Sequence, residues 1–222
     1  MTSLKKYGFS DEDSDWTFQE HFNALEDFMQ SNYNLKGYVD FTIESYNDDG
    51  DFNKPQKFQE LAYSYFCDNT KLIADNLCLG VIKLLPNFLH LYKGIAMPEL
   101  KTIDDVKANV SFEAVGILGD EKEGYAYYIV MFNCTWDDEH GMSMLMHKDR
   151  AVNMGEGDII SEHSDMILQD NMSVEEWKVF EEDRRKKWEE NLAQQLQQQK
   201  LAEVENYTKT LEEKKSKWWK FW

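Results

Sequence analysis

The stretch Asn109-Val-Ser-Phe-Glu-Ala-Val-Gly-Ile-Leu118, followed by Tyr125-Ala-Tyr-Tyr-Ile-Val-Met-Phe-Asn-Cys134, decides the fold class of this 222-residue chain. Both runs are rich in β-branched and aromatic residues, which favour strands. The polar segment 119–124 begins and ends with glycine and separates the two runs, so the pattern predicts a β-hairpin. Residues 142–146 and 151–154 have the pattern of two more strands joined by a short turn. The short connections predict an antiparallel β-meander.

The residues before the hairpin predict helices and one further strand. Residues 16–31 carry apolar side chains at helical spacing, so we expect an amphipathic helix there. Residues 38–45 alternate between apolar and polar and predict a strand. A long helical pattern covers residues 55–85, with a break expected at Asp68-Asn69-Thr70, because these residue types prefer caps to helix interiors. Helix, strand, helices and then a meander predict an α+β fold.

The C-terminal part of the chain predicts one long helix. Ser173-Val-Glu-Glu176 has the capping-box pattern, and no glycine or proline occurs between residue 173 and the end of the chain. We therefore expect a helix over residues 173–215. Its apolar stripe is sparse and interrupted by glutamines, which suits docking on the domain or a coiled coil, including a homo-oligomer.

These patterns divide the chain into five parts. We expect an N-terminal helical segment at 1–35, an α+β domain at 36–160, a polar linker at 161–172, the long helix at 173–215 and a tail at 216–222.

The charge of the chain is unevenly distributed. Residues 1–172 contain 13 Lys and Arg against 31 Asp and Glu, a balance of −18, whereas residues 173–222 contain 11 of each and are neutral. Such a negative field repels nucleic acid, which we therefore do not expect as a partner. The same field favours a basic protein partner, because complementary potentials speed and select encounters. The alternative is that the charge serves only solubility.

Cysteine usage and hydropathy indicate the compartment. The three cysteines, Cys67, Cys78 and Cys134, form no Cys-x-x-Cys pair, which argues for a reducing environment. No signal-peptide core and no apolar run of membrane-spanning length is present. We expect a cytoplasmic protein, bound to a membrane at most peripherally.

The densest group of chemically active side chains is Cys134-Thr-Trp-Asp-Asp-Glu-His-Gly141, followed by His147. Carboxylates and histidines can ligate a divalent metal, so one interpretation is a metal site of Asp137, Glu139, His140 and His147. A second is a partner-binding turn formed by Trp136, Asp137, Glu139 and His140. The third is a structural turn in which Gly141 takes a positive φ and Trp136 plugs the core edge. The spacing contains no helical His-x-x-x-His pair, so no catalytic residue and no cofactor is predicted.

The same segment carries a resemblance to a known family. The run Cys134-x-Trp-Asp-x-Glu-His-Gly141, then a short strand, His147-Lys-Asp-Arg150 and a further strand, resembles an uncharacterised bacterial domain family with a Trp-Asp-x-Glu-His-Gly turn after a β-strand. The resemblance covers about residues 36–160. Some members of that family resemble immunity proteins of bacterial toxin systems, so the resemblance implies a domain with no assigned activity and an immunity-like role.

The tail is the second distinctive feature of the chain. It combines cations with large aromatic rings at Lys217, Trp218, Trp219, Lys220, Phe221 and Trp222. Such a cluster suggests an anchor. It can dock within the protein or its oligomer, enter a groove of a partner protein, or lie at a membrane interface, where tryptophan and lysine are both favoured.

Three functions remain open from the sequence. The leading hypothesis is a non-enzymatic protein-binding module, immunity-like or antitoxin-like, that uses an acidic surface to hold a basic partner. The second is a metal-dependent or acid–base enzyme with its site around residues 134–149. The third is a peripheral membrane adaptor that acts through the C-terminal tail.

Overall fold

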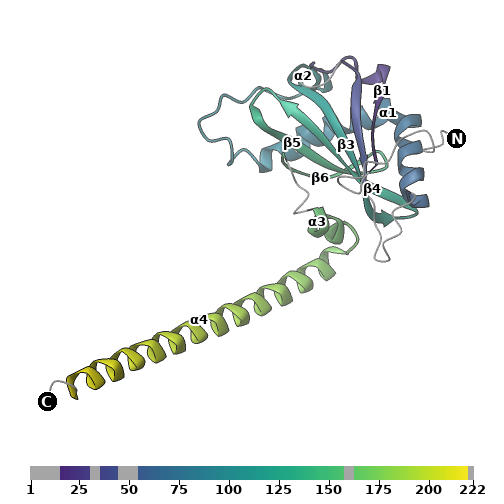
Figure 1. Ribbon diagram of the computed structural model, residues 1–222. Coiled ribbons are helices and arrows are strands. Elements are labelled where there is room, and N and C mark those ends of the chain that lie inside the picture. Colours follow the sequence, from purple (N-terminus) through teal and green to yellow (C-terminus); the bar gives the residue numbers. More distant parts are fainter. Residues whose placement is uncertain (1–15, 31–35, 45–54, 158–162, 220–222) are drawn as a thin grey trace. The chain divides into compact units, whose positions relative to one another are not determined.

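A computed structural model describes residues 16–30, 36–44, 55–157 and 163–219 (Figure 1). The chain divides into two compact units, an N-terminal unit of residues 1–171 and a C-terminal unit of residues 172–222. The N-terminal unit holds the sheet and its core, and the C-terminal unit, where it is described, consists of one long helix.

The N-terminal unit is built on a six-stranded sheet whose spatial order follows the chain. Each strand is antiparallel to its neighbours, except that β2 and β3 run parallel. The connection between these two contains α1 (Lys57–Leu84), the 3-10 helix η3 (Leu85–Asn87) and α2 (Ile103–Asn109). The predicted α+β fold with an antiparallel meander is confirmed. The strands are β1 (Trp16–His21), β2 (Tyr38–Ile43), β3 (Val110–Lys122), β4 (Tyr125–Cys134), β5 (Asp137–His147) and β6 (Arg150–Glu156).

Helix α1 covers one face of the sheet, and its apolar side chains form the main core with alternate residues of the central strands. On β4, Tyr128, Val130 and Phe132 point to this face and are buried. Tyr127 and Ile129 alternate with these residues along β4 and point to the opposite face. There they pack with Leu118, Leu145 and Ile167 in a second, smaller core cluster.

The break expected within the long helix is confirmed. Helix α1 continues through this region, but Asn69 has non-helical angles, φ −125° and ψ 20°. Its side-chain amide donates to the carbonyl oxygen of Tyr65 at 2.9 Å, and the Thr70 hydroxyl donates to that of Phe66. The two side chains therefore supply hydrogen bonds to backbone carbonyl oxygens at the position where the helix is irregular.

The predicted helix over residues 16–31 is wrong, because residues 16–21 form the edge strand β1, followed by a 3-10 helix at Asn23–Leu25. Phe18 and Phe22 are four residues apart, a spacing that suits one face of a helix and equally one face of a strand. Phe18 stacks on Phe41 of β2 at 5.3 Å, and Phe22 packs against Phe66 of α1. The sequence pattern fits both structures, and the hydrogen-bonded pairing with β2 makes residues 16–21 a strand. Residues 1–15 and 31–35 of the predicted N-terminal segment lie outside the described residues.

The predicted linker at 161–172 is also wrong where it is described, because His163–Asp170 forms helix α3. Its composition is polar, but Ile167 is buried in the second core cluster on the sheet. The burial of this side chain, together with the ion pairs of Asp170 described below, provides stabilisation that composition alone does not reveal.

The long C-terminal helix is confirmed as α4 (Val174–Trp219), which runs four residues beyond the predicted end. The predicted capping box is present: the Glu176 amide donates to the Ser173 hydroxyl at 3.2 Å, and the Ser173 amide donates to the Glu176 carboxylate at 2.8 Å. Of the described helices, none combines the length and the apolar character needed to cross a bilayer.

Candidate functional site

The Trp-Asp-x-Glu-His-Gly segment joins β4 to β5 and forms a locally bonded turn. Asp137 accepts a hydrogen bond from the His140 amide at 3.0 Å and lies 3.2 Å from the His140 ring nitrogen Nδ1. Trp136 is buried in the main core, whereas Glu139 and His140 are exposed. The carboxylate of Asp137 therefore organises the turn itself.

Two glycines allow the backbone of this turn to lie close to neighbouring backbone, because they have no Cβ. Gly141 has φ +64°, and a Cβ there would lie 2.8 Å from the Phe132 carbonyl oxygen. A Cβ on Gly157 would lie 2.4 Å from the His140 carbonyl oxygen, and the Gly157 amide donates to the Gly141 carbonyl. These contacts supply the structural explanation for the glycine and the aspartate of the motif.

The structure does not bring together the four residues proposed as metal ligands. Asp137 and His140 lie at the beginning of β5, whereas His147 ends the same strand. Seven residues of extended chain separate the two histidines by about 23 Å. No group of three histidine, cysteine or acidic side chains suited to a metal ion occurs among the described residues.

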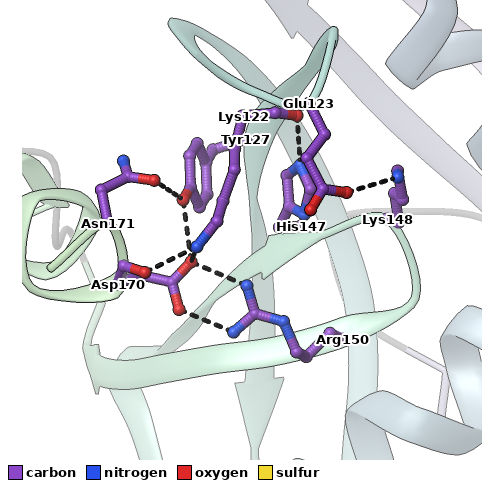
Figure 2. Close-up of polar contacts among 8 residues, drawn as sticks. All are labelled: Lys122, Glu123, Tyr127, His147, Lys148, Arg150, Asp170 and Asn171. Atoms are coloured by element: carbon purple, nitrogen blue, oxygen red, sulfur yellow. Dashed lines mark hydrogen bonds and ion pairs between the residues drawn. The ribbon is translucent and has the colours of Figure 1, made fainter. Parts of the chain in front are cut away.

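His147 instead belongs to a polar cluster at the opposite end of the sheet, where α3 meets the strands (Figure 2). Its centre is Asp170, the last residue of α3. Arg150 donates to both Asp170 carboxylate oxygens at 2.7 Å, and Lys122 donates to one of them at 2.9 Å and to the Asp170 backbone carbonyl at 2.6 Å. The Tyr127 hydroxyl donates to the same carboxylate at 2.8 Å. The cluster thus ties α3 to β3, β4 and β6.

We name Asp170 and its three side-chain donors, Lys122, Tyr127 and Arg150, the latch. The protonation states of its members suit a structural role. Burial alone would raise the pKa of Asp170, but hydrogen bonds from Arg150, Lys122 and Tyr127 outweigh it and hold the pKa well below its usual range. Burial, reinforced by the bond to Asp170, raises the pKa of Tyr127. Burial lowers the pKa of His147, whose Nε2 lies 2.8 Å from the Lys122 carbonyl oxygen and therefore carries the proton. At neutral pH the latch therefore joins a charged carboxylate to a neutral phenol and two cations.

Beside the latch lies an open depression of about 840 Å³, bordered by the β3–β4 turn, the β5–β6 turn and α1. Two of its charged groups compensate each other: Lys148 pairs with Glu123 at 3.0 Å and lies 4.5 Å from the Tyr125 ring centroid. From α1, Asn76 donates to the carboxylate and carbonyl of Asp149. The depression is a charged surface feature with no nucleophile–base pair in its lining.

Next to this depression, the tip of the β3–β4 hairpin carries more acidic than basic side chains. Asp120, Glu121 and Glu123 are exposed, and Glu123 and Gly124 both have positive φ, as a tight hairpin turn requires. Lys122 is the only base between residues 119 and 124, and its ammonium group points to Asp170 on α3 (Figure 2). We name Asp120, Glu121 and Glu123 the acidic tip.

Sequence reasoning did not single out the acidic tip or the latch. The signal for the tip was present in the group of acidic residues between two glycines. The direction of Lys122 was not readable, because it depends on Asp170, which lies 48 residues further along the chain.

The predicted tail anchor is only partly described. Lys217, Trp218 and Trp219 continue the backbone of α4, and nothing further is defined for their side chains. Lys220, Phe221 and Trp222 lie outside the described residues.

Comparisons with known proteins give a family and no activity. Neither the curated proteins nor the solved structures contain a match to this chain. Residues 11–161 match the family described as "Domain of unknown function (DUF6985)", and this range contains all six strands of the sheet. On this match over more than half of its length, the chain belongs to the DUF6985 family.

Proposed function

We propose that this protein is a non-enzymatic binding module that uses an acidic surface to hold a basic protein partner. The sequence resemblance to a bacterial family with immunity-like members supports a role in which binding keeps the partner inactive.

The observation that carries the proposal is the acidic tip. Three exposed carboxylates gather at one hairpin turn, and the only base of that turn is directed away to Asp170. The end of β3 carries Asp120 and Glu121, and the two-residue turn that follows carries Glu123. Electrostatic complementarity between such a group and a basic surface raises association rates and selects partners. Lys148 compensates only Glu123.

The ion pairs of the N-terminal unit leave few of its bases available to neutralise the exposed carboxylates. Most described bases of the N-terminal unit are already paired with a carboxylate of the same unit, while further exposed carboxylates such as Asp40, Asp68 and Glu156 add to the negative surface. The pairs are Lys57–Glu60, Lys71–Asp75, Lys101–Glu99, Lys107–Asp75, Lys122–Asp170, Lys148–Glu123 and Arg150–Asp170. A basic partner would therefore meet carboxylates with few competing cations.

The geometry gives less support to an enzyme at residues 134–149. Asp137 serves the local turn, His140 is separated from His147 by the length of β5, and Cys134 is buried. The depression of about 840 Å³ beside Asp170 is lined by residues outside this turn.

Affinity purification of the full chain from the cells that produce it tests the proposal. We expect a basic protein to co-purify at low salt and to be lost near 1 M salt, where the screening length falls to about 3 Å. Asp120→Lys with Glu121→Lys should reduce its recovery by at least about tenfold, because attraction becomes repulsion. The matched control is Asp104→Lys with Glu156→Lys, which makes the same charge change at two exposed carboxylates, one on α2 and one at the end of β6.

An immunity-like role makes a second measurement available. Addition of the purified chain should suppress the activity of the captured partner, and the double variant should fail to do so. Equal recovery of the partner by the double variant and the control, or recovery that is insensitive to salt, would contradict the proposal.

A further inference from the structure

The side chains of α4 are exposed along most of its described length. Each described side chain between residues 181 and 210 is exposed. The helix has 46 residues and is therefore about 69 Å long. In its described part, ion pairs three or four residues apart join side chains between residues 181 and 189. Exposed pairs of this kind contribute little stability, so a helix of this length and polarity favours association with a partner helix.

One face of α4 carries large apolar side chains. At about 100° per residue, Trp188, Leu192, Leu196 and Tyr207 lie within about 100° of one another around the helix axis. They are 39–68% exposed. A stripe of this width is the one by which a helix packs on a neighbour. This face can therefore contact another helix.

The charges of α4 form an ordered pattern along its axis. Residues 181–183 are all acidic, and residues 184–187 are all basic. Toward the C-terminus, residues 212–213 are both acidic, and residues 214–217 contain three lysines. Each end of the helix thus has an acidic block followed, in chain order, by a basic block. Because α4 is one continuous helix, this order along the chain is also an order along the axis.

The order of the blocks selects the orientation of a second copy. In a parallel pair in register, each block faces the same block, so residues 184–187 meet four like charges. In an antiparallel pair aligned at Gln199, residues 181–183 of one copy face residues 215–217 of the other, and residues 184–187 face residues 211–214. The acidic block then meets lysines, and the basic block meets two glutamates. The blocks of one sequence therefore complement each other in the antiparallel orientation.

The complementary charges also lie on the side of the helix that carries the apolar stripe. Helical spacing places Glu181 and Arg185 on the face of Trp188, and their side chains are 53% and 67% exposed. The antiparallel alignment sets positions 217 and 213 opposite them, and these positions lie on or beside the same face. Charge and apolar contact therefore act at one interface.

We propose that α4 binds the α4 helix of a second copy of this chain as an antiparallel pair. Residues 188–196 of one copy lie opposite residues 202–210 of the other, so that the two apolar stripes face each other. Apolar contacts supply the attraction, and the charge blocks set orientation and register. The pairing involves the C-terminal unit alone and is independent of the acidic tip.

Sedimentation equilibrium of the full chain tests the pairing. The parent should have twice the 26.3 kDa mass of one chain. Glu181→Lys, Glu182→Lys and Asp183→Lys together should raise the dissociation constant of the dimer at least about tenfold, because lysines then face lysines. The matched control makes the same charge change at three exposed carboxylates of the N-terminal unit and should dimerise as the parent does. Its substitutions are Asp68→Lys, Glu139→Lys and Glu156→Lys.

A further variant tests the orientation. Adding Lys214→Glu, Lys215→Glu and Lys217→Glu to the reversed acidic block makes the two ends complementary again, so the dimer should be restored. A parallel pair would gain nothing from this change, because like blocks would still face each other. Circular dichroism should show the same helix content in every variant.

Three outcomes would overturn the proposal. The first is a parent chain that sediments with the mass of one chain. The second is equal weakening of the dimer in the acidic-block variant and in the control. The third is a dimer that the combined variant fails to restore while its helix content is kept. None of these variants alters the acidic tip, so failure here leaves the proposed function unaffected.

Discussion

Arg150 on β6 and Asp170 at the end of α3 form a bidentate ion pair in which both nitrogen–oxygen distances are 2.7 Å. The geometry matches the planar guanidinium to the carboxylate, which is the strongest form of such a pair. Lys122 and Tyr127 bond the same carboxylate from β3 and β4. One side chain of α3 is thus held by three strands, and this latch also turns Lys122 away from the acidic tip.

Asp170→Asn should lower the free energy of unfolding by about 2 kcal/mol at pH 7, because three donors lose their charged acceptor. The pKa of Asp170 is lower in the folded chain than the ordinary value of about 3.9. Its contribution is therefore complete above pH 4 and is lost as the pH falls through the folded pKa. Urea unfolding should show the difference between variant and parent shrinking below pH 4, while the exposed-site control Asp68→Asn should differ little at any pH.

His147 should make stability depend on pH in a different range. Burial lowers the pKa of its imidazole in the folded chain below the unfolded value of about 6.5. The unfolded chain therefore binds a proton first, and stability should fall as the pH drops below about 6.5. His147→Gln keeps a donor for the Lys122 carbonyl and should flatten this part of the curve. Thermal unfolding between pH 7 and pH 5 measures it, with His90→Gln as the exposed control; a curve unchanged by His147→Gln would contradict the assignment.

Gly80→Ala should destabilise the chain although alanine favours helices. A Cβ at position 80 of α1 would lie 2.6 Å from the Ala151 Cβ and 3.1 Å from the Met144 methyl. Overpacking costs about 1–3 kcal/mol and the gain in helix propensity is about 1 kcal/mol, so we expect a net loss of about 1 kcal/mol. Chemical denaturation provides the measurement. Gly116→Ala on β3 has no neighbour within 4 Å of the new Cβ and should be close to neutral.

Gly141→Ala tests the structural explanation of the Trp-Asp-x-Glu-His-Gly turn. The positive φ costs any other residue about 1–2 kcal/mol, and the new Cβ would approach the Phe132 carbonyl at 2.8 Å. The variant should therefore have a clearly lower Tm, whereas His140→Ala at the adjacent exposed position should change stability by less than about 0.5 kcal/mol. A larger loss in His140→Ala than in Gly141→Ala would show that the turn depends on its histidine.

The meander was predictable because strands β3 to β6 are contiguous in the chain and joined by tight turns. Local alternation and turn chemistry therefore determine their pairing. The break at Asn69 was predictable for a similar reason, since its side chain bonds a carbonyl only four residues away. Local interactions of this kind can be read from neighbouring residues.

The two elements that were predicted wrongly depend on contacts with residues distant in the sequence. Phe18 and Phe22 fit a helix and a strand equally well, and only pairing with β2 makes residues 16–21 a strand. The polar composition of residues 163–170 hides a helix whose stability comes from Ile167 on the sheet and Asp170 on Arg150. Side-chain period and composition carry no information about such long-range contacts.

The features of the candidate sites also divide into those that depend on adjacent residues and those that depend on distant contacts. The sequence alone determined the surplus of carboxylates in the first 172 residues and the type of the long C-terminal helix, since charge and helical periodicity are properties of adjacent residues. It gave the local turn at Asp137 as one of three interpretations. Only the tertiary structure decided that His147 lies far from His140 and that Lys122 points away from the acidic tip. The direction of a side chain depends on which distant group satisfies it, and that group is brought near only when the sheet and helices pack.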